Sequence, residues 1–426
     1  MQGSIAIVGA DVRTMDAAGT HAEAVLVRDG VIAAVGSSVD IARQADEAGI
    51  RILEVDGATV LPGFVDAHTH LELASYSLSR WPQAHTPPLE SLTEVADVIR
   101  AHLRDNPGDD FVLVRSSFGM HAKVSEGRLF TRAELDEIEP VRPLGVASGL
   151  HVLSLNTSGM HELGIFDLPD GPERVIHRDA DGAPSGVVTV ADMVKIMVDG
   201  SDTTFIQQDE LRAAILAADA AGFNMHFHSY ADVSTTWILD GIEEAIRVNG
   251  PRRRRNHIAH LFVVAPHDYA RFGELGVSAN VQGLWAGSSV PHDHIHPSAT
   301  PDPVAHEYPF GRMHAAGTPL AAGSDWPVTT PDPFLAARTA AGDYPVSDGY
   351  KEMSPTDRLD PVAMLTAFTT GSAYVNGRAD RTGRVAPGFL ADLAILDRDV
   401  IGDPAALAEV AVDETWIGGR RVFRRG

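Results

Sequence analysis

Short apolar runs alternate with amphipathic segments through the middle of the chain. Residues 208–221, between two such runs, fit an amphipathic helix that carries Leu211 and Ile215 on one face. Strands that alternate with helices indicate βα units and a parallel sheet, and eight of them fit a (β/α)8 TIM-type barrel with its sites at the carboxyl ends of the strands. The expected barrel strands are residues 64–67, 111–115, 144–147, 193–198, 224–227, 257–259, 277–281 and 320–322.

The two ends of the chain have a different pattern, in which short β-branched runs are joined by turns. Residues 4–61 contain several such runs, with Asp29 and Gly30 as a strong hairpin signal, and residues 414–422 have the same character. Neither end contains residues spaced as in a catalytic motif. Because both ends are rich in short strands, we expect them to pair with each other in one small β domain. The predicted domains are a composite β-sandwich formed by residues 1–61 with 378–426, and the barrel formed by residues 62–377.

Composition narrows the chemistry that the chain can support. The 426 residues include no cysteine, which excludes disulfides, thiolate metal sites and a cysteine nucleophile. A net charge of −24 argues against a nucleic-acid partner. The start of the chain has no basic, apolar leader and no run is long enough to span a bilayer, so we expect a cytoplasmic protein without a membrane partner.

The apolar run that follows Pro62 and Gly63 ends in two histidines, His68 and His70. Positions i and i+2 of a strand project to the same face, so the two imidazoles can converge on one point. Two buried rings without partners would be costly, and a metal ion would satisfy both. We interpret the pair as metal ligands rather than as histidines packed there by chance.

Three further strand exits carry side chains of the same kind. His228, His260 and Asp325 each end an apolar run. Any one of them alone is best interpreted as a core residue with satisfied hydrogen bonds. Together with the first histidine pair they form the donor set of a mononuclear or dinuclear metal hydrolase.

These motifs resemble the amidohydrolase superfamily. Residues 61–70 match its opening pattern Pro-Gly-Phe-x-Asp-x-His-x-His, and residues 323–328 are most similar to amidohydrolase family 3. The resemblance implies that His68, His70, His228, His260 and Asp325 bind one or two divalent ions, and that Asp325 also transfers protons. Zinc is the first choice, and manganese, iron and cobalt remain open.

The resemblance extends to residues outside the ligand set. Lys195 lies in a segment similar to the Lys-x-x-x-Asp-Gly strand of the family, in which a carboxylated lysine can bridge two metals; an ordinary ion-paired lysine is the alternative. The stretch that is missing relative to typical members lies between Gly186 and Lys195. His151 corresponds to a residue that lines the substrate pocket. Trp285 and Trp326 are candidate apolar walls of that pocket, or simply packing residues.

The leading hypothesis is hydrolysis of a non-peptide C–N bond, in an amide, N-acyl or N-formyl group of a small molecule, by a metal-activated water with Asp325 as general base and acid. His151 and Lys195 are further candidate catalytic residues. The same site could cleave an ester, a lactone or a phosphotriester. A third hypothesis is a non-catalytic protein that binds metal or a small molecule. Assembly into a homo-oligomer is open.

Overall fold

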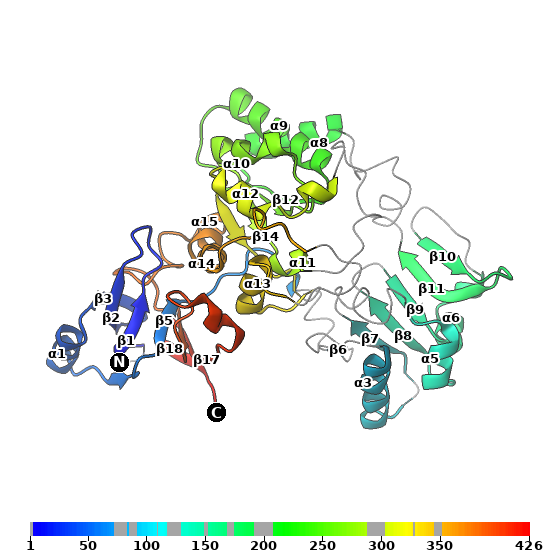
Figure 1. Cartoon of the computed structure of the whole chain (residues 1–426), viewed down its shortest axis with the longest axis horizontal. Helices are drawn as coiled ribbons and strands as arrows, with labels where there is room; N and C mark the ends of the chain where they lie inside the picture. The colour runs from blue at the N-terminus through cyan, green and yellow to red at the C-terminus, as the bar shows by residue number, and fades with distance from the viewer. Residues whose placement is uncertain are drawn as a thin grey trace.

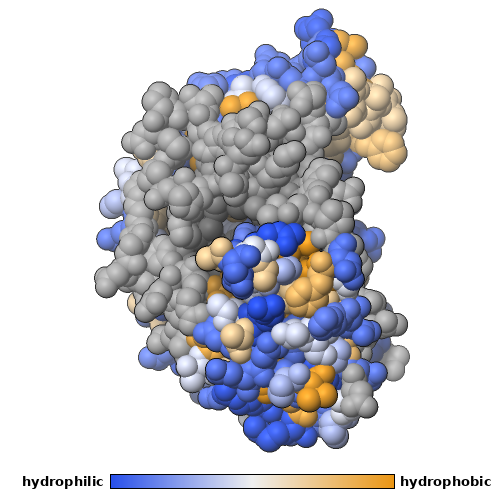
Figure 2. All heavy atoms as spheres, turned by 90° about the vertical axis from the view of Figure 1, so that its right-hand side faces the viewer, coloured by the Kyte–Doolittle hydropathy of each residue, from blue (hydrophilic) through white to orange (hydrophobic). Residues whose placement is uncertain are grey.

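The computed structural model describes residues 3–71, 83–84, 92–108, 110–116, 129–148, 152–167, 174–190, 208–287, 303–326, 329–344 and 352–426. Within this part of the chain, no helix is both long enough and apolar enough to cross a bilayer. On the face in Figure 2, the coloured surface is mainly hydrophilic and hydrophobic side chains gather only in small separate areas.

The two ends of the chain form one mixed sheet. Its N-terminal strands are β1 (Ile5–Arg13), β2 (His21–Arg28), β3 (Val31–Gly36), β4 (Ile52–Glu54) and β5 (Thr59–Pro62); its C-terminal strands are β16 (Leu393–Leu396), β17 (Val412–Ile417) and β18 (Arg420–Arg424). The order is β18-β17-β16-β5-β1-β2-β3, with β4 also on β1. The two ends meet where β16 pairs antiparallel with β5. The labelled strands of this sheet lie on the left of Figure 1.

Both faces of this terminal sheet are buried at β1 and β2. Alternate residues of β1 and β2, such as Ile7 and Val25, pack into a cluster with Trp416. Their neighbours pack on the other face against helix α1 (Ser38–Ala48). We did not predict this helix, although Ser37 caps its start and Gly49 ends it in a left-handed conformation. The sequence analysis was therefore incomplete for residues 38–48.

The predicted alternation of strands and helices is clearest in the second half of the middle region. Strands β12 (His226–Ser229), β13 (His257–His260), β14 (Ser278–Val281) and β15 (Leu320–Ala322) form a parallel sheet in that order. In Figure 1 the helices lie around it, with α8, α9 and α10 above the sheet. The α-helices of this region are α8 (Gln208–Ala220), α9 (Asp232–Asn249), α10 (Tyr269–Leu275), α11 (Gly283–Ala286), α12 (Phe310–Ala315), α13 (Pro333–Ala340), α14 (Pro361–Thr366) and α15 (Ser372–Val375). Short 3-10 helices are η2 (Pro266–Asp268), η4 (Pro303–His306) and, nearer the C-terminus, η6 (Pro404–Ala408), and η5 (Ala367–Gly371) is a short π-helix.

The first half of the middle region forms a separate sheet, on the right of Figure 1. Its order is β10-β11-β9-β8-β7-β6, from β6 (Gln83–Ala84), β7 (Val112–Ser116), β8 (Leu144–Ser148), β9 (Val152–Leu155), β10 (Arg174–Arg178) and β11 (Pro184–Val190). Helices α3 (Leu92–Asp105), α5 (Arg132–Ile138) and α6 (Thr157–Glu162) and turn η1 (Ile165–Asp167) accompany it. Strands β7 and β8 confirm two predicted strands, whereas the antiparallel strands β9–β11 were not predicted. The strand expected at residues 193–198 lies outside the described residues.

The prediction of a strand at residues 64–67 was wrong. These residues form no strand, and their amides bond to two different elements: Val65 donates to the carbonyl of Phe368, and Ala67 donates to the carbonyl of Ala322 at the end of β15. A segment that divides its hydrogen bonds in this way forms no continuous ladder with one neighbour. It nevertheless lies beside β15, which is the place that a first barrel element needs.

Candidate metal centre

Backbone hydrogen bonds bring the segment of the first histidine pair against the chain that leaves β15. The amide of Asp325 donates to the carbonyl of His68 over 2.7 Å, and the amide of His70 donates to the carbonyl of Trp326 over 2.8 Å. Residues that are more than 250 positions apart in sequence are thus fixed within one small region of the fold.

The carboxylate of Asp66 joins the same two segments a second time. It accepts hydrogen bonds from the amide of His68 over 3.1 Å, from the amide of Ser324 over 3.0 Å, and from the hydroxyl of Ser324. Burial raises the pKa of Asp66, although these hydrogen bonds and the nearby His68 act in the opposite direction. This explains the aspartate of the opening motif as a clamp rather than as a ligand.

Gly323 allows the two segments to approach this closely. A Cβ atom at this position would lie 2.4 Å from the Cβ of His68 and 2.6 Å from its backbone nitrogen. No side chain fits at such distances, so the close contact requires glycine.

The side chains of His68, His70 and Asp325 converge where the two segments meet. The Nε2 atoms of His68 and His70 each lie 3.0 Å from Oδ1 of Asp325. The side chains of His68 and Asp325 are 2% and 4% exposed, whereas that of His70 is 25% exposed. The cluster is therefore shielded on one side and open to solvent at His70.

His228 and His260 approach the same point from the neighbouring strands β12 and β13. The ring centroid of His68 lies 4.7 Å from that of His228 and 5.0 Å from that of His260. Donor atoms of His68, His260 and Asp325 all lie within 4.8 Å of one another. The structure thus brings together all five residues that the sequence singled out as ligands.

Two of these residues have an unusual backbone. His260 and Asp325 have positive φ angles of 72° and 62°. Left-handed backbone at a residue other than glycine costs of order 1–3 kcal/mol and concentrates at functional sites. The left-handed backbone sets the direction of each side chain at the end of its strand. The surrounding structure must hold this backbone conformation in place.

The electrostatics of the cluster suit a cation. Burial alone would raise the pKa of Asp325, but hydrogen bonds from His68 and His70 outweigh it and hold the pKa below its ordinary value. Burial lowers the pKa of His260 well below its ordinary value. The pKa of His228 is lowered to about 4 by desolvation and by the neighbouring His68, although part of this residue is exposed to solvent. An ionised carboxylate and neutral imidazoles are the forms in which these side chains bind metals.

His260 supplies a direct test of whether a metal fits. Both of its ring nitrogens are buried, and neither has a hydrogen-bond partner among the described residues. Buried polar atoms without partners are costly, so a ligand that is not a protein side chain is expected here. Imidazole nitrogens with one carboxylate oxygen suit zinc, and also other first-row divalent metals. The residues present therefore fit a divalent cation.

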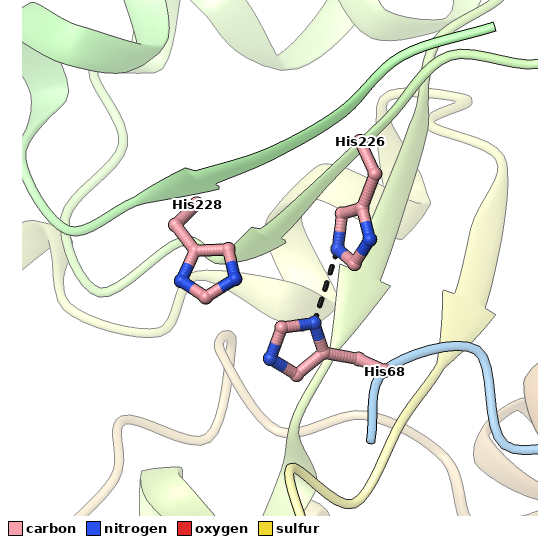
Figure 3. A group of neighbouring side chains, drawn as sticks. All are labelled: His68, His226 and His228. Atoms are coloured by element: carbon pink, nitrogen blue, oxygen red, sulfur yellow. Dashed lines mark hydrogen bonds between the residues drawn. The ribbon is translucent and has the colours of Figure 1, made fainter. Parts of the chain in front are cut away.

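One histidine of the cluster was missed from sequence. His226 precedes His228 by two residues on β12, and the donor atoms of His68, His226 and His228 lie within 4.8 Å of one another (Figure 3). The signal was present, because His226-x-His228 repeats the spacing of His68-x-His70. Only the second histidine of that pair had been chosen.

The remaining predicted site residues have different outcomes. The side chain of Trp285 is buried, with its ring 5.2 Å from that of Phe262 and 5.7 Å from that of His260. Trp285 thus packs behind a predicted ligand. Trp326 is half-buried beside the first histidine pair. Two further candidates, His151 and Lys195, lie outside the described residues.

Comparison with solved structures identifies the fold. A metal-dependent hydrolase of Pyrococcus furiosus matches with a TM-score of 0.64 and 17% identity, over 93% of this chain and 99% of the other. An atrazine chlorohydrolase of Arthrobacter aurescens, crystallised with zinc and atraton, matches with a TM-score of 0.51 and 18% identity, over 99% of this chain and 95% of the other. The protein has the TIM-barrel fold of metal-dependent hydrolases, with a separate mixed sheet formed by the terminal strands.

Comparison with sequences identifies the family. N-substituted formamide deformylase of Arthrobacter pascens is 24% identical over 98% of both chains. The sequence model of the amidohydrolase family matches residues 51–199 and 189–423. The two matched segments overlap at residues 189–199, a stretch that includes Lys195. The two matches together span most of the chain, which therefore belongs to amidohydrolase family 3.

Proposed function

We propose that this protein hydrolyses a non-peptide carbon–nitrogen bond in an amide, N-acyl or N-formyl group of a small molecule. The reaction uses one or two divalent metal ions, with zinc as the first choice. The observation that carries the proposal is the convergence of four histidines with Asp325. One of the four, His260, has two buried ring nitrogens that lack hydrogen-bond partners among the described residues.

The residues that would hold the ion are His68, His70, His228, His260 and Asp325. When bound, a divalent cation supplies Lewis acidity that lowers the pKa of water toward about 7. The protein contributes a fixed arrangement of donors, because the ligand segments are joined by backbone bonds and by glycine at position 323. Lys195 remains a predicted bridging ligand in carboxylated form.

Asp325 is the residue that we assign to proton transfer. Its carboxylate is kept ionised by His68 and His70, and it therefore accepts a proton at an Oδ atom. The same group can return that proton to the departing amine, which is the step that C–N cleavage requires. His70, the more exposed member of the pair, marks the side from which a substrate can approach.

The choice of a C–N bond rests on the family and on the names of two relatives. One is the deformylase described above, and the other is an imidazolonepropionase of Porphyromonas gingivalis, 23% identical over 88% of this chain and 82% of that protein. The site itself suits acyl transfer from nitrogen or oxygen, so the bond must be decided by experiment.

The test uses zinc-reconstituted protein and matched pairs of substrates in which the same acyl group is joined to nitrogen or to oxygen. We expect turnover of an N-formyl or N-acyl member, and loss of this turnover when a chelator removes the metal. The control is Asp325→Asn, which should retain metal while kcat falls by roughly 10²–10⁴-fold. Turnover of oxygen esters alone would reassign the bond. Metal-loaded protein that hydrolyses neither class would contradict the proposed function.

A further inference from the structure

His226 lies against the side of His68 that faces away from Asp325. Its Nε2 atom is 3.0 Å from Nδ1 of His68 (Figure 3), whereas Nε2 of His68 lies against Asp325. The two nitrogens of one imidazole therefore have separate partners. The His226 ring enters from β12, two residues before His228.

A metal ion on Nε2 of His68 would take the place of the hydrogen bond from Nε2 to Asp325, and would thereby fix the direction of the bond between Nδ1 and His226. A neutral ring has one N–H and one lone pair, so a histidine that gives its Nε2 lone pair to a metal must carry its proton on Nδ1. That proton then needs an acceptor, and ligating histidines almost always have one. At Nδ1 of His68 the atom in position to accept is Nε2 of His226.

Other contacts hold the His226 ring in place. It stacks on His257, with ring centroids 4.0 Å apart and planes 19° from parallel. Nδ2 of Asn280 lies 3.1 Å from Nδ1 of His257 and also donates to the carbonyl of Ala67 over 3.0 Å. Ala67 directly precedes His68. The contacts therefore run from the His68 ring through His226, His257 and Asn280 to the peptide group just before His68.

We propose that His226 is a positioning residue of the metal centre: it accepts the Nδ1 proton of His68 and thereby presents Nε2 of His68 to the ion. This proposal rests on the proposed function only in so far as that function requires a bound metal. It differs from the ligand set of the family resemblance, in which His226 has no role. The competing possibility, that His226 itself ligates an ion with His68 and His228, predicts a different metal count.

The test compares His226→Phe, which keeps a ring against His257 but removes the acceptor, with His226→Gln, whose side-chain oxygen can accept in place of Nε2. The control is His314→Leu on the exposed side of α12. Zn²⁺ affinity is measured by competition with a chelator, and zinc content by elemental analysis. We expect the Phe variant to bind zinc about 10–100-fold more weakly with an unchanged number of sites, the usual effect of losing an outer partner. The Gln variant and the control should stay near wild type.

A Phe variant with wild-type affinity would overturn the proposal, and so would a Gln variant that loses as much as Phe. A loss of one zinc per chain, with normal affinity at the remaining site, would show that His226 is a ligand. Thermal unfolding of the metal-free variants checks the fold, and His226→Leu provides the same comparison if the Phe variant does not fold. Wild-type protein that binds no zinc would contradict the proposed function itself, whereas normal wild-type binding together with an unaffected Phe variant would refute only the role of His226.

Discussion

Replacing Asp66 with alanine tests the clamp that joins the two ligand segments. The substitution removes the acceptor of three hydrogen bonds, which come from the amides of His68 and Ser324 and from the Ser324 hydroxyl. Both amides would be left beside a methyl group. The two segments would keep the bonds between their backbones and the side-chain contacts of His68 and His70 with Asp325.

The expected size follows from these three bonds. A hydrogen bond to a charged group contributes roughly 1.5–3 kcal/mol. Burial of the Asp66 carboxylate, visible in its raised pKa, offsets part of that gain. We therefore take the lower end for each bond, and expect Asp66→Ala to reduce the free energy of unfolding by about 4.5 kcal/mol. Zinc affinity should fall with it, because the displaced amide belongs to His68.

The assay is urea unfolding of the metal-free protein at neutral pH, followed by zinc titration of the folded variants. Asp66→Asn is the matched control, because its amide oxygen can still accept from both backbone amides. The Asn variant should lie between wild type and Asp66→Ala. An Asp66→Ala protein within about 0.5 kcal/mol of wild type, the range of an ordinary surface substitution, would refute the clamp.

Three further predictions address the fold and the metal count. Gly323→Ala should lower the free energy of unfolding by about 1–3 kcal/mol or more through overpacking, whereas Gly36→Ala, where a Cβ meets nothing within 4 Å, should not; urea unfolding compares them. Asp219→Ala should cost about 3–5 kcal/mol, because it strands the buried Arg254. Since Arg254 lowers the pKa of Asp219 in the folded state, this stabilisation is complete above the unfolded pKa of about 3.9 and is lost as pH falls below it, which an acid titration of wild type and variant would detect. Lys195→Ala should reduce the zinc content from two ions to one if the lysine is carboxylated, and an unchanged elemental analysis would exclude that role.

The ligands could be predicted because their signal is local. His228 and His260 each end an apolar run, and the parallel strands β12 and β13 carry those ends to one edge of the sheet. Choosing the residue that ends each apolar run also explains why His226 was not predicted, although it shares a strand face with His228. Periodicity shows that two such residues point the same way, but not which nitrogen contacts a metal and which contacts another ring.

Other features depend on partners that are distant in sequence, and local patterns do not reveal them. Residues 64–67 have the composition of a strand, yet their amides bond to a helical segment and to the end of β15. The apolar runs of β9 and β11 are similar to those of the predicted barrel strands, and their antiparallel direction is set by pairing alone. Helix α1 is different, since its capping residues Ser37 and Gly49 could have been recognised.

The strained ligands bear on how metal binding and folding are related. His260 and Asp325 both have positive φ, and the amide of each is bonded to a neighbouring element: to Oε1 of Gln282 over 2.5 Å and to the carbonyl of His68 over 2.7 Å. Gln282 is in turn bonded to Asn280, both of them buried. These bonds are between protein groups only, so the scaffold itself can hold the strained backbone. The donors are then arranged before an ion arrives, in contrast to small zinc domains in which the metal drives folding. Removing the metal should for this reason abolish activity while leaving the barrel folded.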